Sequence, residues 1–227
     1  MAKSISKQEI RRNPLAEWVG AAVRFVQAHQ VAILTTAVLL AIGATGIGVF
    51  WWHQQRQEQE ASRLLGNAFA ATRGEGQGST GNPEEAAKLF REVVKQYPKS
   101  VSAEEALIAL GDIQYDAKKL DDALVSFTQY LTIFPRGRFV MEAALGKAYT
   151  QEAKGDLQGA TQTLSQVLDK RKDDPLAGEA YMSLARVYEE EKKPDDAIRV
   201  YGEVVEKYPQ TRWAQNAMQK MSTLKSK

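Results

Sequence analysis

The sequence predicts an all-α protein, in which a single N-terminal transmembrane helix precedes a solenoid of helical hairpins. Two observations lead to this fold class. Residues 31–52 form an uncharged apolar run, and after it alanines recur every 37 residues within amphipathic segments. A fixed period of this length is typical of stacked helical repeats. The 227 residues are enough for one ordinary domain and an appendage.

The apolar run, VAILTTAVLLAIGATGIGVFWW, is long enough to cross a bilayer, because roughly 20 apolar residues in a helix span the hydrocarbon core. Trp51 and Trp52 at its end are suited to the membrane interface. A cleaved signal peptide is the alternative, but it has a shorter apolar core and a small-residue cleavage site. We therefore expect residues 31–52 to form a retained transmembrane helix.

Basic residues before the run predict its orientation, because lysine and arginine collect on the cytoplasmic side of a span. We expect residues 1–30 to be a short basic cytoplasmic segment, and residues 53–227 to form a domain across the membrane. The basic residues are Lys3, Lys7, Arg11, Arg12 and Arg24.

Residues 13–30, NPLAEWVGAAVRFVQAHQ, have the apolar spacing of an amphipathic helix. Such a helix can lie in the cytoplasmic interface, with Arg24 toward the headgroups. It can equally be a simple extension of the transmembrane helix. The sequence leaves both interpretations open.

The repeated alanines mark the second helix of each hairpin. They are Ala86, Ala123, Ala160 and Ala197. A large apolar side chain follows four residues later in each copy, at Phe90, Phe127, Leu164 and Tyr201. Each segment then closes on a proline, which ends a helix; these prolines are Pro98, Pro135, Pro175 and Pro209.

A leucine followed by a small residue marks each first helix, at Leu65-Gly66, Leu110-Gly111, Leu145-Gly146 and Leu184-Ala185. Together these features resemble the tetratricopeptide repeat, Leu-Gly-x-x-Tyr, then Ala-x-x-x-Phe, then Pro. In the third copy the pattern predicts insertions in the turn and before Pro175. The first copy carries the glycine-rich insertion RGEGQGSTGN. The expected boundaries are 58–98, 103–135, 138–175 and 177–209, with a capping helix at 211–225.

Composition argues against catalysis and against most ligand classes. The net charge of +2 indicates no nucleic-acid partner, and no cysteine is present. The two histidines, His29 and His53, flank the apolar run and cannot build a metal site alone. Acidic pairs such as Asp121-Asp122 stand at helix starts, where negative charge is favoured. We therefore expect no enzyme, no cofactor, no metal and no small-molecule substrate.

The tetratricopeptide resemblance implies that the first helix of each hairpin lines a groove for a partner peptide. Carrying the family's groove positions onto this chain nominates one set of residues from each copy. They are Arg63 and Asn67; Ile108, Asp112 and Tyr115; Lys147 and Thr150; and Met182, Arg186 and Glu189.

The layout of the N-terminal part resembles the bacterial ancillary SecYEG translocon subunit family (YfgM-like). A basic start and a Gly/Ala-rich span ending in WW are followed by the connector HQQRQEQEASRLLGNAF. The resemblance implies a single-pass protein of the bacterial inner membrane, with its repeat domain in the periplasm. Its expected partners are the SecYEG translocon, exported proteins, and a periplasmic chaperone or peptidyl-prolyl isomerase-like protein.

A second resemblance supports an alternative role. The strings KQYPKSVSAEEAL and EKYPQTRWAQNAM resemble repeats of the outer-membrane assembly lipoprotein and of the Tol-Pal coordinator. Those proteins have a lipobox cysteine or a cleaved signal, and this sequence contains no cysteine. The alternative is therefore a scaffold in cell-envelope assembly or division.

Overall fold

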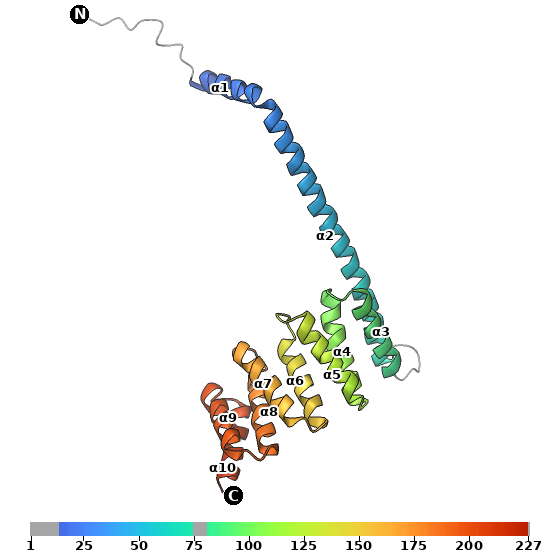
Figure 1. Ribbon diagram of the computed structural model, residues 1–227, viewed down its shortest axis with the longest axis vertical. Helices are drawn as coiled ribbons and strands as arrows, with labels where there is room; N and C mark the ends of the chain where they lie inside the picture. The colour runs from blue at the N-terminus through green and yellow to red at the C-terminus, as the bar shows by residue number, and fades with distance from the viewer. Residues whose placement is uncertain (1–13, 75–80, 227) are drawn as a thin grey trace, which may run out of the picture. The chain divides into compact units, whose positions relative to one another are not determined.

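The computed structural model describes residues 14–74 and 81–226, and these residues form helices joined by turns (Figure 1). The basic residues at positions 3, 7, 11 and 12, and most of the glycine-rich insertion, lie outside them. The all-α prediction is confirmed. The helices are α1 Pro14–Ala28, α2 Gln30–Arg73, α3 Pro83–Gln96, α4 Val101–Asp116, α5 Leu120–Ile133, α6 Val140–Ala153, α7 Leu157–Lys170, α8 Ala177–Glu190, α9 Pro194–Lys207 and α10 Arg212–Lys225.

The chain divides into two compact units, Met1–Arg56 and Gln57–Lys227, with the boundary inside α2. In the first unit α1 and α2 are separate helices with a turn at His29 between them, so α1 is not an extension of α2. By length and composition, α2 can cross a membrane. Large apolar side chains of this part of α2, such as Leu39, Leu40 and Phe50, are exposed.

In the second unit the hairpins α4–α5, α6–α7 and α8–α9 repeat with a constant period. Their second helices begin at residues 120, 157 and 194, which are 37 residues apart. Each turn has one residue with positive φ at the same place: Lys118 (58°), Gly155 (79°) and Lys192 (58°). The third copy therefore has no insertion in its turn, and the sequence prediction of one is wrong.

The end of the third copy also needs correction. Pro98, Pro135 and Pro209 occupy equivalent places, but the period puts Lys172 where a fourth proline is expected. Pro175 instead lies in the turn before α8. The turns after α5 and after α7 each span six residues, 134–139 and 171–176. The apparent insertion before Pro175 is therefore a missing proline and not extra chain.

Interactions across the first hairpin tie the C-terminal part of α2 to α3 and α4. The Glu58 carboxylate accepts hydrogen bonds from the backbone N–H groups of Val101 (2.9 Å) and Ser102 (3.0 Å). It thereby satisfies donors at the start of α4 that have no partner within the helix. The rings of Phe69 on α2 and Phe90 on α3 lie 5.0 Å apart. Residues 57–73 of α2 thus act as the first helix of the first hairpin.

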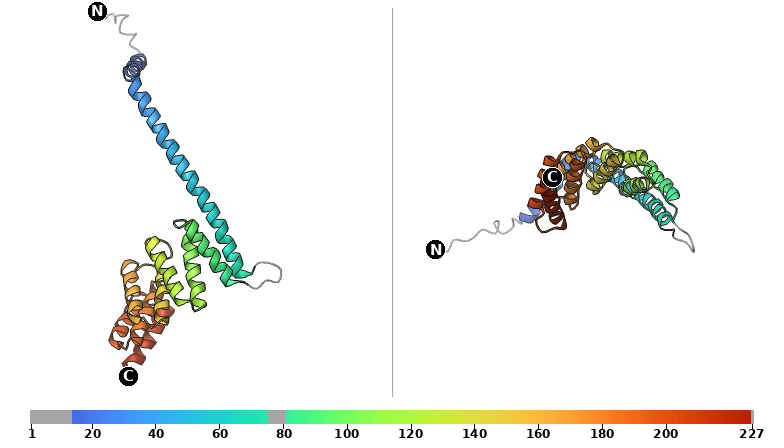
Figure 2. Two further views of the ribbon diagram at one scale, coloured as in Figure 1. Left: turned by 45° about the vertical axis from the view of Figure 1, so that its right-hand side comes forward. Right: turned by 90° about the horizontal axis from the view of Figure 1, so that it is seen from below.

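The helices of the second unit follow one another in a curved row (Figure 2). The first helix of each hairpin contacts the first helix of the next one directly, α4 with α6 and α6 with α8, and α8 contacts the capping helix α10. Within the described residues, the second helices α5, α7 and α9 make no such contacts with one another. Neighbours are closer on the inner side of a curve, so the first helices lie on the inner side of the row.

Candidate protein-binding surface

Packing between the two helices of a hairpin identifies the register of the third copy. Ala148 and Ala160 are both fully buried, as are Ala123, Ala185 and Ala197 at the equivalent positions, and Gly111 is the equivalent of Ala148 in α4. In α4–α5 the hydroxyl of Ser126 hydrogen-bonds the side-chain amide of Gln114 (2.6 Å). Thr163 makes the same bond to Gln151 (2.8 Å), again across 12 residues. Ala148, and not Gly146, is therefore the small residue that faces the second helix.

This register changes which side chains of α6 face the inner side. By the 37-residue period, Asp112 and Tyr115 correspond to Tyr149 and Glu152. Thr150 is 0% exposed and donates a hydrogen bond to the carbonyl oxygen of Gly146 (2.7 Å), so it offers no side-chain surface to a partner.

Lys147 is also displaced from the expected face, since it lines a pocket between α5 and α7. Tyr149 and Glu152 were missed because the Leu145-Gly146 pair imitates the family motif. The strict 37-residue spacing was the signal that could have found them.

The other expected groove residues are placed as follows. Arg63 and Asn67 on α2 and Asp112 on α4 are exposed. Tyr115 on α4 and three residues of α8 are half-buried, and Ile108 is buried. The three residues of α8 are Met182, Arg186 and Glu189.

Equivalent positions of α4, α6 and α8 form one surface, which we call the inner surface. The same helical position carries a glutamate in all three helices, at residues 105, 142 and 179. Most of the remaining members are acidic or aromatic. The inner surface comprises Glu105, Asp112, Tyr115, Asp116, Glu142, Tyr149, Glu152, Glu179, Met182, Arg186, Glu189 and Glu190.

Three carboxylates in the middle of the inner surface lack cationic partners. Within the described residues, Asp112, Asp116 and Glu142 form no ion pair. Although Asp112 is exposed at its outer edge, neighbouring atoms displace part of the hydration of its carboxylate. This partial loss of hydration, followed by the charges of Glu142 and Asp116, raises the pKa of Asp112 to about 6. Burial also raises the pKa of Glu142. A cation placed here would relieve this mutual repulsion.

Toward α8, the inner surface is already organised by internal contacts. Arg186 forms an ion pair with Glu152 of the preceding hairpin and lies 5.8 Å from the ring centre of Tyr149. The Tyr149 hydroxyl lies 3.0 Å from carboxylate Oε1 of Glu179 and 3.0 Å from the hydroxyl of Ser183. These bonds fix α6 against α8. Arg186 is the cationic member of the inner surface, and Arg138 and Lys220 pair from outside the set with its Glu105 and Glu189.

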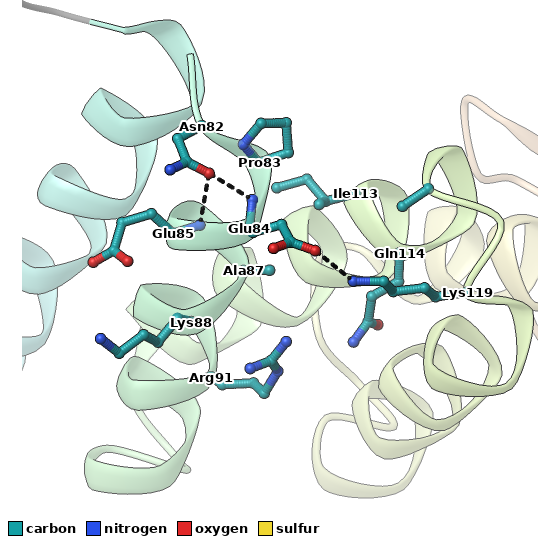
Figure 3. A pocket seen from close by; sticks show the side chains of 11 residues that line it. Asn82, Pro83, Glu84, Glu85, Ala87, Lys88, Arg91, Ile113, Gln114 and Lys119 are labelled. Carbon is teal, nitrogen blue, oxygen red and sulfur yellow. Dashed lines mark hydrogen bonds and ion pairs between the residues drawn. The ribbon is translucent and has the colours of Figure 1, made fainter.

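A separate cavity of about 640 Å³ lies at the start of α3 (Figure 3). Its polar side chains mainly serve the fold: Asn82 accepts from the N–H groups of Glu84 and Glu85 (both 3.2 Å), and Lys119 pairs with Glu84 (3.0 Å). Its charges are mixed, since Lys88 and Arg91 stand beside these carboxylates. In the described part of the chain, no group of three metal-ligating side chains occurs.

Comparison with known proteins supports the resemblance found in the N-terminal layout. A protein of Neisseria gonorrhoeae (strain ATCC 700825 / FA 1090) named ancillary SecYEG translocon subunit is 26% identical over 191 residues. The match covers 83% of this chain and 86% of the relative. The predicted similarity to this family is thus confirmed.

Solved structures with the same fold have low sequence identity to the chain. A tetratricopeptide repeat protein from Parabacteroides merdae ATCC 43184 superposes with a TM-score of 0.59 at 16% identity, covering 74% of this chain and 61% of that one. MamA from Desulfovibrio magneticus RS-1 gives a TM-score of 0.52 at 17% identity, covering 75% and 90%. These likenesses establish the tetratricopeptide-type fold.

The family comparison covers most of the repeat domain. The model of the family described as "YfiO: Outer membrane lipoprotein" matches residues 69–227, from the end of α2 through α10. Because this match spans more than half of the 227 residues, the chain belongs to that family.

Proposed function

We propose that the chain is a non-enzymatic, membrane-anchored adaptor that acts as an ancillary subunit of the SecYEG translocon and links exported proteins to periplasmic chaperones. The observation that carries this proposal is the inner surface, where Asp112, Asp116 and Glu142 lie near Tyr115 and Tyr149 and form no ion pair with any described residue. The similarity to the Neisseria translocon subunit supports the choice of the translocon.

The proposed anchor is a single transmembrane helix at residues 31–52, within α2. Residues 1–30 would then be cytoplasmic and residues 53–227 would form the periplasmic repeat domain. The basic residues before the span support this orientation. The chain has no cysteine, so one cysteine introduced at Lys172 can report the side of the membrane. Labelling by a membrane-impermeant maleimide in cells with a permeable outer membrane supports the periplasmic placement, and protection contradicts it.

The partner chemistry follows from the charges of the inner surface. Lysine or arginine side chains would pair with Asp112, Asp116 and Glu142, and could also stack on Tyr115 and Tyr149. We therefore propose a basic, extended or helical segment as the partner, from an exported protein or from a chaperone or peptidyl-prolyl isomerase-like protein. Electrostatic attraction of this kind mainly speeds association and weakens as salt is added.

The residue types support an adaptor rather than an enzyme. Catalysis requires a nucleophile and base, or a metal, in one pocket. The sequence contains no cysteine, and its two histidines border the apolar run. Hydrolase or isomerase activity in the fragment 57–227 would contradict the proposal.

Affinity capture of the full-length chain in mild detergent tests the adaptor role. We expect the wild-type chain to co-purify with SecYEG and with a periplasmic chaperone. The variant Asp112→Asn/Asp116→Asn/Glu142→Gln should keep SecYEG, which the span would hold, and lose the chaperone. Glu206→Gln, which neutralises an exposed acid of α9, is the matched control and should keep both. Loss of neither partner from the triple variant contradicts the role of the inner surface.

The family match supports one second candidate, a scaffold in cell-envelope assembly or division, because its description refers to an outer-membrane lipoprotein. This role would use the same repeat domain with different partners. Recovery of outer-membrane assembly or Tol-Pal proteins in place of SecYEG would favour it.

A further inference from the structure

A second surface suited to binding lies between the second helices α5 and α7. A pocket of about 270 Å³ opens there, with α6 as its floor. Its α6 residues are Val140, Ala144 and Lys147, which follow one another at helical spacing on a single stripe. At 100° per residue, the centre of this stripe lies about 180° around α6 from Glu142 and Tyr149. The pocket and the inner surface are therefore on opposite sides of α6.

The pocket coincides with a break in the repeat pattern. By the 37-residue period, Lys147 corresponds to Leu110 in α4 and Leu184 in α8, which are 4% and 6% exposed. A core leucine is thus replaced in the third hairpin by a half-buried lysine. A half-buried lysine gives up part of the apolar burial that leucine provides in the other two hairpins. Lysine at residue 147 therefore contributes less to the stability of the fold than leucine would. A role in binding a ligand would account for its presence.

The charged groups that line the pocket are all cationic: Lys147, Lys170 and Arg171. Within the described residues, Lys147 and Lys170 make neither an ion pair nor a side-chain hydrogen bond. Arg171 donates one hydrogen bond, to the carbonyl oxygen of Gly137 (3.2 Å), and keeps other N–H groups available. The pocket therefore offers donors for an anionic group.

The rest of the lining is apolar or neutral. Leu131, Pro135, Val140, Ala144 and Val167 supply an apolar floor and wall, and Thr128, Thr132 and Gln166 add neutral polar groups. An apolar surface next to unpaired cations fits a ligand that carries both an apolar side chain and carboxylates.

We propose that the α5–α7 pocket binds an acidic segment of a partner protein, with an apolar side chain in the pocket and carboxylates on Lys147, Lys170 and Arg171. Charge complementarity selects this occupant, because the described lining contains three cations and no carboxylate. The site goes beyond the proposed adaptor function, since it would take a partner of opposite charge to the one expected on the inner surface. One hairpin could thereby contact two different segments.

The test uses the full-length chain in phosphatidylcholine nanodiscs and fluorescein-labelled peptides, followed by fluorescence anisotropy. We expect saturable binding of a peptide with the core Glu-Leu-Glu and none of its Gln-Leu-Gln counterpart. Lys147→Leu restores the residue of the other hairpins, so it should fold with at least the wild-type melting temperature. It should weaken Glu-Leu-Glu binding about tenfold or more, as expected when a charged hydrogen bond is lost.

Lys172→Gln is the matched control, because Lys172 is an exposed cation next to the pocket but outside its lining. Its affinity should stay within about twofold of wild type, a change of at most ~0.4 kcal/mol. Equal binding of the Gln-Leu-Gln peptide, or unchanged affinity in Lys147→Leu, overturns the proposal. Displacement of the peptide by phosphatidylglycerol vesicles that bind wild type and not Lys147→Leu also overturns it, in favour of a lipid headgroup.

Discussion

The ring of Phe127 on α5 packs directly against the backbone of Gly146 on α6, across the boundary between two hairpins. A Cβ added at Gly146 would lie 2.6 Å from Phe127 Cε1, and one added at Gly111 would lie at the same distance. Phe127 therefore packs between α4, the first helix of its own hairpin, and α6, the first helix of the next hairpin. This contact explains why a glycine occurs at residue 146.

The contact predicts that Gly146→Ala destabilises the repeat domain despite the better helix propensity of alanine. Overpacking of a core costs roughly 1–3 kcal/mol, against a gain of about 1 kcal/mol from propensity, so we expect a net loss of about 1 kcal/mol. Gly66→Ala is the control, because an added Cβ there meets nothing within 4 Å. In urea unfolding of the fragment 57–227, the free energy of unfolding should fall for Gly146→Ala and rise for Gly66→Ala. Stabilisation by Gly146→Ala would contradict the close packing of Phe127 against Gly146.

The turn residues with positive φ predict a second stability effect. Lys192 has a φ of 58° where Gly155 has 79°, and a left-handed conformation costs a non-glycine residue about 1 kcal/mol. Lys192→Gly should therefore raise the melting temperature slightly or leave it unchanged, whereas Gly155→Ala should lower it. Thermal unfolding monitored by circular dichroism measures both. A stabilising Gly155→Ala would show that the turn is not under this constraint.

The raised pKa of Asp112 predicts a pH-dependent stability. The carboxyl has a pKa of about 6 in the folded chain and about 4 when unfolded. The folded state thus binds more protons between these values, so stability falls as pH rises from about 4 to about 6. Asp112→Asn should be more stable than wild type above pH 6, by about 1 kcal/mol or less once solvent screening is considered.

The difference between Asp112→Asn and wild type should disappear below pH 4, where both side chains are neutral. Urea titrations of fragment 57–227 at pH 3.5 and pH 8 provide the comparison. A variant that is less stable than wild type at pH 8, or a gain that persists at pH 3.5, would contradict the assignment.

Partner capture should depend on Tyr115 and Arg186 together. Tyr115 provides an aromatic ring on α4, and Arg186 joins α8 to Glu152 of α6. We expect Tyr115→Ala/Arg186→Ala to weaken the pull-down of a periplasmic partner about tenfold, because truncation of interface aromatic and arginine residues commonly costs more than 1 kcal/mol. Circular dichroism should show that the helices persist. Unchanged pull-down would remove these residues from the binding surface.

Much of the fold could be predicted from the sequence, because the alanines at 86, 123, 160 and 197 are buried contacts between paired helices. Small side chains are required wherever two helices touch, so the period survives large changes elsewhere. The third copy misled the prediction for a physical reason. Gly146 lies against Phe127 of the preceding hairpin, where a larger side chain would not fit. This glycine resembles the small residue of the family motif, which in this hairpin is Ala148, two residues later.

The surface was less predictable than the core. Lys147 and Thr150 were expected in a groove, whereas Tyr149 and Glu152 hold the equivalent positions. An error of two residues turns a side chain by about 200° around a helix, which moves it to the opposite face. The acidic character of the inner surface and the cationic α5–α7 pocket both depend on the corrected register, so neither could be derived from the motif alone.

Site-specific photocrosslinking in living cells tests the translocon-adaptor account most directly. A benzoylphenylalanine would replace Leu39 in the span or Tyr149 on the inner surface, with Val125, which is 64% exposed on α5, as the control position. The account predicts SecY adducts from position 39, adducts to an exported protein or periplasmic chaperone from position 149, and neither from position 125. Adducts from position 39 only to Tol-Pal or outer-membrane assembly proteins, with none to SecYEG, would contradict it.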